Sequence, residues 1–476
     1  MKLSKNKILI AAISSVIFYW GCKPPMLSTV SDVKKVPATF INADSTNIAT
    51  TQWRNFFTDP TLVSLIDTAL KNNQELYITL QEIEIARNEI RMKHGRLFPT
   101  VEGGVGAGIE KVGRYTSQGA GDASADITPG KVVPEMLGDL NLGATVNWEV
   151  DIWKKLHNAK KAAVKRYLAT VEGKNFVITN LIAEVANSYY ELLALNSQLD
   201  IVRKNIVIQQ RALEIVRIQK QAAAANELAV KKFEAEVLGT QSLEFDIQQK
   251  INAQENKINF LLGRYSNKIL IDSVNFLSLQ SMPIAVGIPS QLLNNRPDVK
   301  QAEFELAAAK LDLKVARAEF YPSFNISSKL GLQAFNPAYL LKFPESVLFS
   351  IAGDLAGPLI NKNAIKAEYY NANSRQIQAM YNYERTILNA YFEVSTELSN
   401  LSNLEKSYQL KSMQVNTLNA SVDISNDLFK SAKADYLEVL HTQRDALDAK
   451  LELIETKLNQ FNSTINIYKA LGGGWR

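Results

Sequence analysis

The sequence predicts a mainly helical α+β membrane protein in which each chain supplies part of a transmembrane β-barrel. Three observations lead to this fold class: four short segments alternate apolar and polar residues, four long stretches carry a helical apolar period, and both kinds recur in the same order in each half of the chain. The 476 residues are 46% hydrophobic and 21% charged, which excludes a disordered chain. The net charge of +5 gives no indication of nucleic-acid binding.

The start of the chain has the layout of a secretory signal. A lysine-containing stretch precedes apolar residues from Ile8 to Trp20, and Gly21-Cys22 follows at once. Cys22 is the only cysteine, so no disulfide can form within the chain. A Gly-Cys pair at this point resembles the lipobox of bacterial lipoproteins, and we therefore expect a covalent lipid on Cys22. The alternative is an ordinary signal peptide with an incidental cysteine.

Four segments alternate with period two, at about residues 100–115, 141–153, 322–335 and 346–358. Each has the length of a tilted strand that crosses a bilayer, with one apolar face and one polar face. Half-buried strands of a soluble sheet are the alternative for any single segment. The charged residues expected on the polar, lumen-facing side are Glu102, Glu110, Glu149, Asp151, Lys329 and Asp354. This excess of acids predicts a mildly cation-preferring pore.

Four strands are too few to close a barrel, since single-chain barrels begin at about eight strands. An open edge in lipid leaves backbone N–H and C=O groups without partners. Other copies of the chain must therefore complete the barrel, although the strand count does not fix their number.

Each strand pair is followed by a long helical hairpin, at about residues 156–221 with 227–262 and 363–430 with 436–471. From Leu181 to Val216 apolar residues recur at alternating spacings of four and three, which is a coiled-coil seam. Ser188 and Gln209 are the polar members of that series. A helix of about 66 residues extends about 100 Å, so these helices should pack on neighbouring subunits; a soluble bundle is the alternative.

These patterns divide the chain into four parts. Residues 1–21 are a signal peptide and 22–51 a lipid-anchored extended leader. Residues 52–275 form a first repeat, and 276–476 form a second repeat, each with a helix, two barrel strands and a long helical hairpin.

No catalytic constellation is present in the sequence. The three histidines, His94, His157 and His441, are scattered and do not have metal-ligand spacing. We therefore expect no enzymatic activity, no metal site and no cofactor apart from the lipid on Cys22.

Five motifs in order resemble one family over nearly the whole mature chain: Trp53–Pro60, Trp148–Trp153, Ala183–Leu192, Asn295–Glu303 and Ala470–Trp475. The family is that of the TolC-like outer membrane factors of bacterial tripartite efflux pumps, and the chain is most similar to their lipid-anchored NodT/OprM type. The resemblance implies a homotrimer, with four strands per protomer in a 12-stranded outer-membrane barrel that continues as a periplasmic α-helical tunnel. It also implies outer membrane lipid around the barrel, a periplasmic adaptor, and an inner-membrane pump of the resistance-nodulation-division type as partners.

The function implied is a passive exit duct for small molecules. The outer component of a type I protein secretion system is one alternative, and a non-pore coiled-coil envelope scaffold is another.

The resemblance also implies two functional regions on the hairpins. The adaptor would dock at the tips, at Ala224, Asn226 and Leu228 in the first and at Lys433, Asp435 and Leu437 in the second, where plain solvated turns are the alternative. The periplasmic aperture would be lined by Glu438 and His441, which lie three residues apart on one helix face.

Overall fold

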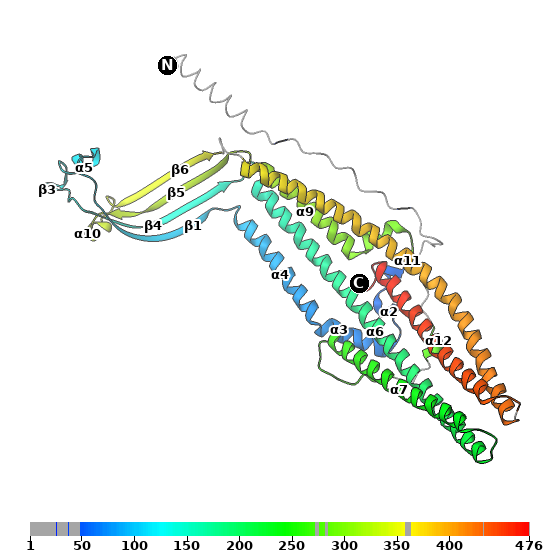
Figure 1. Ribbon diagram of the computed structural model, residues 1–476. Helices are drawn as coiled ribbons and strands as arrows, with labels where there is room; N and C mark the ends of the chain where they lie inside the picture. The colour runs from blue at the N-terminus through cyan, green and yellow to red at the C-terminus, as the bar shows by residue number, and fades with distance from the viewer. Residues whose placement is uncertain are drawn as a thin grey trace. The chain divides into compact units, whose positions relative to one another are not determined.

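The computed structural model describes residues 25, 37, 48–271, 276–280, 284–357, 363–431 and 433–475 (Figure 1). The predicted signal peptide, Cys22 and most of the predicted leader lie outside these residues. The chain packs as two compact units, and each draws on both sequence repeats. From residue 48 onward, the first unit comprises Glu84–Leu168 and the described residues of Phe304–Met380, and the second unit comprises the rest.

The first unit contains a four-stranded antiparallel sheet in the order β1-β4-β5-β6. Its strands are β1 (Thr100–Glu110), β4 (Leu137–Val150), β5 (Ser323–Ala334) and β6 (Val347–Ala356). All four strands expected from the alternation are present, with different ends. Glu110, the last residue of β1, pairs with Leu137, the first residue of β4. β1 therefore ends earlier, and β4 begins earlier, than the sequence pattern predicts.

Two connections join the strands of the sheet. Between β1 and β4 lie α5 (Ser117–Asp122) and a small hairpin of β2 (Asp126–Thr128) and β3 (Lys131–Val132). Between β5 and β6 lies α10 (Pro337–Leu340). Neither stretch shows a helical or strand period in the sequence, because the elements there are too short.

Helices of the first unit adjoin the ends of the strands. They include the later part of α4 (Gln74–Gly95) and most of α9 (Pro297–Ala318). Phe320, which follows α9, is buried against Tyr369 and Ala372 of α11 (Asn363–Lys430). An ion pair between Arg166 and Asp312 ties α9 to α6 (Lys155–Gln221).

The second unit is built mainly from two long helical hairpins. The first joins α6 to α7 (Glu227–Leu261), and the second joins α11 to α12 (Tyr436–Ala470). These bounds agree with the sequence prediction to within one residue, because proline-free apolar periods define long helices well. None of the helices in the described part of the chain is long and apolar enough to span a bilayer.

The two hairpins repeat the same cross-link. In the first, Arg203 Nε lies 2.8 Å from Glu244 Oε1, and in the second, Lys411 Nζ lies 3.0 Å from Glu452 Oε2. Both pairs are 41 residues apart in sequence. The two hairpins therefore share this contact at the same sequence spacing.

The core of the second unit is an aromatic cluster around the opening motif, which forms α2 (Trp53–Phe56) and leads into α3 (Pro60–Asn72). Phe56 stacks on Tyr468 of α12 with ring centroids 4.0 Å apart. The Asp59 carboxylate caps α3 by accepting from Thr61 N at 2.8 Å, and it also accepts from Tyr189 Oη at 2.7 Å. Burial, together with this carboxylate, raises the pKa of Tyr189, which keeps its hydroxyl protonated as the donor.

The mid-chain motif meets the end of the chain in the same unit, beside α8 (Leu292–Asn295). The short 3₁₀ turns η1 (Ile48–Thr50), η2 (Phe276–Ser278) and η3 (Pro289–Gln291) also belong to this unit. Arg296 donates to both oxygens of Asp298, to Glu393 Oε2 at 2.8 Å and to the carbonyl of Ala470 at 2.7 Å. Gly472 has a φ of +88°, and a Cβ there would lie 2.6 Å from the Asn295 carbonyl oxygen. Glycine is therefore required where α12 ends.

Candidate channel-forming site

The register of the sheet places one set of polar side chains on a single face. Glu102, Thr145 and Lys329 form one cross-strand row, and Glu149, Asn325 and Asp354 form another. Glu110 shares the face through its partner Leu137. Asp139, which the alternation does not single out, also lies there and accepts from Gln333 Nε2 at 2.7 Å. It escapes prediction because its strand begins before the segment that alternates clearly in the sequence.

The opposite face of the sheet is apolar and is not covered by any other part of the described chain. Val105, Phe349 and Ile351 are 83%, 76% and 79% exposed. Other large apolar residues with the same strand parity are also exposed: Val101, Ile109, Leu142, Leu330, Val347 and Leu355. Monomeric soluble proteins rarely leave so continuous an apolar surface in water, so this face requires an apolar partner or lipid.

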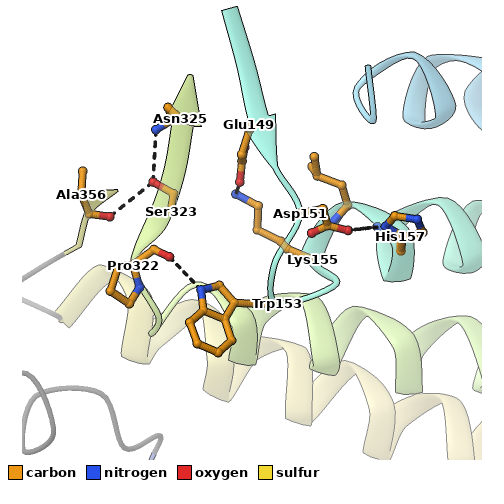
Figure 2. Close-up of polar contacts among 10 residues, drawn as sticks. Glu149, Asp151, Trp153, Lys155, His157, Pro322, Ser323, Asn325 and Ala356 are labelled. Carbon is orange, nitrogen blue, oxygen red and sulfur yellow. Dashed lines mark hydrogen bonds and ion pairs between the residues drawn. The ribbon is translucent and has the colours of Figure 1, made fainter. Parts of the chain in front are cut away.

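The structure corrects the assignment of Asp151 to the polar strand face (Figure 2). β4 ends at Val150, and Asp151 turns to the start of α6, where its carboxylate accepts from Leu156 N at 3.0 Å and His157 N at 2.8 Å. His157 Nδ1 lies 2.6 Å from the same carboxylate. Burial raises the pKa of Asp151, but these hydrogen bonds outweigh burial and lower it overall.

Neighbouring contacts fix the same junction (Figure 2). Glu149 Oε1 lies 2.5 Å from Lys155 Nζ, so this acid is partly neutralised. Trp153 Nε1 donates to the carbonyl of Pro322 at 2.8 Å, and its ring stacks on Tyr321 with centroids 4.8 Å apart. Trp153 therefore belongs to the junction and not to a strand, contrary to its place in the predicted 141–153 segment.

The first hairpin tip is a tight turn between α6 and α7. Ala223 has a positive φ of 56°, a left-handed conformation that disfavours a Cβ. Asn226 caps α7 by accepting from Ala229 N at 2.9 Å, so this side chain is partly committed to its own helix. Leu228 is exposed, and Ala224 N donates to Gln219 O at 2.8 Å.

The second tip joins α11 to α12. Lys433 N donates to Leu428 O at 2.8 Å, and Lys433 and Asp435 are exposed whereas Leu437 is half-buried. Asp435 occupies the N-cap position of α12, but its side chain makes no capping hydrogen bond. Both tips therefore offer exposed side chains, as docking residues must.

Glu438 and His441 both lie exposed on α12, one turn apart. The structure adds further exposed acids on the same helix face, at spacings of three and four: Asp445, Asp448, Glu452 and Glu455. The sequence alone singles out only the first two, because charges on long helices usually form a solvated face. The opposite side of α12 is buried, so the acids form one defined stripe and do not belong to a helix that is solvated all round.

A stripe of exposed apolar residues follows α11. Its exposed large apolar residues are Tyr381, Leu388, Phe392, Leu410, Met413, Ile424 and Leu428. At 3.6 residues per turn these positions fall within about 60° of one another around the helix axis, so they share one face. This apolar stripe was also missed, because the sequence pattern cannot tell an apolar face buried within the chain from one left open.

Among the described residues, no group of three His, Cys, Asp or Glu side chains is placed to hold a metal ion.

A four-stranded sheet with one polar and one apolar face, together with two long helical hairpins, is the architecture of a membrane channel protein. Residues 65–264 and 288–473 match the family model described as outer membrane efflux protein. The chain belongs to this family, whose members are channels and not enzymes.

Relatives identified by sequence and a solved structure agree with this family assignment. The chain is 27% identical over 427 residues to the pyoverdine export outer membrane protein OpmQ of Pseudomonas aeruginosa, covering 89% of this chain and 88% of OpmQ. It is 24% identical over 475 residues to the probable outer membrane lipoprotein SilC of Salmonella typhimurium, covering 98% and 99% of the two chains. A crystal structure of CusC matches with a TM-score of 0.82 and 25% identity over 95% of this chain and 99% of that one.

Proposed function

We propose that the chain is the outer-membrane exit duct of a tripartite efflux pump, passive in itself and open to small molecules. The observation that carries this proposal is the sheet: one face is apolar and exposed, the other is polar, and within the described residues neither edge strand pairs with a further strand. An exposed apolar face of this size is unfavourable in water. Open strand edges are unfavourable in lipid unless they are paired.

The sheet topology supports closure by identical copies. β1 and β6 are the edge strands, and three successive antiparallel pairings make them run in opposite directions. β6 of one copy can therefore pair with β1 of the next in the same antiparallel sense, giving a total that is a multiple of four. We take three copies and 12 strands, in line with the family to which the chain belongs.

The helices supply a second contact between copies. The apolar stripe of α11 needs a partner, and the chain leaves exposed apolar residues on α7 as well, at Leu228, Leu238, Phe245 and Phe260. Stripes of this kind on separate helices form coiled-coil contacts when they meet. The acidic stripe of α12 would then line the tunnel, with Glu438 and His441 at its narrow end.

Membrane attachment and partners complete the proposal. A lipid on Cys22 would hold the leader in the membrane, as expected of a lipoprotein. The two tips would dock a periplasmic adaptor that connects the duct to an inner-membrane pump. OpmQ is named for pyoverdine export and CusC for cation efflux, each at 27% identity to this chain, so identity does not favour one cargo.

A matched pair of substitutions on β6 tests the channel wall. Ile351 and Ala352 are neighbours that point to opposite faces of the sheet. We expect Ile351→Lys to impair outer-membrane insertion, since a lysine on a lipid-facing position costs about 2–4 kcal/mol near mid-membrane. Ala352→Lys should insert normally and lower the cation preference of the pore in planar bilayers.

The alternatives predict other results. A non-pore scaffold gives no conductance and equal tolerance of both lysines. A secretion component conducts but complements a protein-export defect in place of a drug-efflux defect in a host that lacks its own outer-membrane duct.

A further inference from the structure

A layer of buried polar side chains interrupts the apolar packing of the helical hairpins. It consists of Gln209 on α6, Thr240 on α7 and Gln443 on α12, which we call the polar layer. Each side chain is more than nine-tenths buried. Buried amides and hydroxyls are uncommon in coiled-coil seams, where they act on register and specificity rather than on stability.

The three residues lie at one level between two apolar clusters. Toward the tips is a cluster that includes Leu213, Val216, Phe233 and Val237, with Phe429, Tyr436 and Leu440 of the second hairpin packed against it; we call this the tip cluster. Away from the tips is a second cluster that includes Ile206, Ile247 and Leu447. On each of the three helices the polar residue therefore separates one cluster from the other.

Hydrogen bonding within the layer is uneven. Thr240 Oγ1 donates to Glu236 O at 3.0 Å, and Gln443 Nε2 lies 3.5 Å from Asn426 Oδ1. Gln209 is 1% exposed, and neither its Oε1 nor its Nε2 has a hydrogen-bond partner among the residues that the structure describes. An unsatisfied amide in a low-dielectric interior is unfavourable. A leucine at this position would therefore make the packing of the seam more stable than Gln209 does.

We propose that the polar layer is the pivot about which the tip cluster shifts when the aperture opens, and that Gln209 gains its hydrogen-bond partners in the shifted packing. This inference rests on the proposed channel function. Glu438 and His441 lie on the tip side of Gln443 in α12, so a shift of the tip cluster about the layer moves them. A continuous apolar seam would strongly favour the resting packing of the helices. An unsatisfied amide raises the free energy of the resting packing, so the free-energy difference from the shifted packing becomes smaller.

Substitutions at Gln209 test the pivot in single-channel recordings of the full-length protein in planar bilayers. Gln209→Leu should raise the midpoint of thermal unfolding and lower the open probability by about tenfold, because it removes an unfavourable group from the resting packing only. Gln209→Asn keeps an amide at the site and should restore most of the open probability.

A satisfied buried amide provides the control. Gln254 on α7 is also buried, and its Nε2 donates to the carbonyl of Ser188 at 2.9 Å. Gln254→Leu should lower the unfolding midpoint and leave the open probability unchanged. An unchanged open probability in Gln209→Leu contradicts the pivot while leaving the channel function intact; absence of conductance in the unmodified protein refutes the channel function itself.

Hydrogen exchange on the unmodified protein is a second test that needs no variant. The pivot predicts a step at the polar layer, with backbone amides of residues 210–239 and 433–442 exchanging at least about tenfold faster than those of residues 195–208. Uniform protection along the hairpins would overturn the proposal even if every variant failed to fold.

Discussion

Removal of the Arg296 side chain should destabilise the protein more than removal of any surface ion pair. Its side chain is only 6% exposed and contacts two carboxylates, with Asp298 19% and Glu393 52% exposed. Burial lowers the pKa of Arg296, but both carboxylates outweigh burial and raise it, so the guanidinium is charged at every accessible pH. The same group also holds the Ala470 carbonyl at the end of α12.

The magnitude follows from what the substitution leaves behind. Arg296→Met keeps the volume and strands the Asp298 carboxylate, and breaking a buried pair in this way costs about 3–5 kcal/mol. Glu393 is half exposed and regains water, so it adds little. We expect this loss in the free energy of unfolding, measured by denaturant titration of the detergent-solubilised protein.

Two companion variants separate charge from packing. Arg296→Met combined with Asp298→Asn and Glu393→Gln should recover part of the loss, because no charge is then stranded. Lys204→Ala breaks an exposed pair with Asp200 and should leave stability unchanged. A single Arg296→Met variant that unfolds like the original protein would refute the reasoning.

Three other sites give further predictions. Ala223→Gly should stabilise the first tip by about 1 kcal/mol because of its positive φ, seen as a higher thermal midpoint, whereas the same change at Ala224 should not. Asp151→Ala should cost about 1 kcal/mol at neutral pH through loss of the helix cap; since the pKa of Asp151 is lowered by folding, its contribution disappears on acidification below about pH 4, where the two unfolding free energies should converge. Glu438→Gln should reduce the cation selectivity of reversal potentials in planar bilayers, and an unaltered reversal potential would remove Glu438 from the aperture.

The long elements of this fold could be predicted from the sequence. The predicted bounds of the hairpin helices are correct to within a residue, and alternation alone assigns the two faces of the sheet. Both succeed because their periods, 3.6 and 2, persist over many residues. Asp151 and Trp153 were misassigned because alternation continues past Val150 in the sequence, whereas the backbone turns there to begin α6.

The roles of the family motifs could not be read from the sequence. Arg296 and the Ala470–Trp475 ending are far apart in the chain, yet Arg296 Nη1 donates a hydrogen bond to the Ala470 carbonyl. Asp59 and Tyr189 from two other motifs meet in the same way. These motifs therefore hold the helices together, while the residues proposed to line the channel lie outside most of them. Likewise, the unsatisfied state of Gln209 depends on three helices packing together, which no local pattern reports.

The central claim is that identical copies complete the sheet, and the mass of the purified assembly tests it most directly. Native mass spectrometry of the full-length protein released from detergent should give three times the mass of one lipidated chain. A stable single chain under the same conditions, with β1 and β6 both left open, would contradict the account.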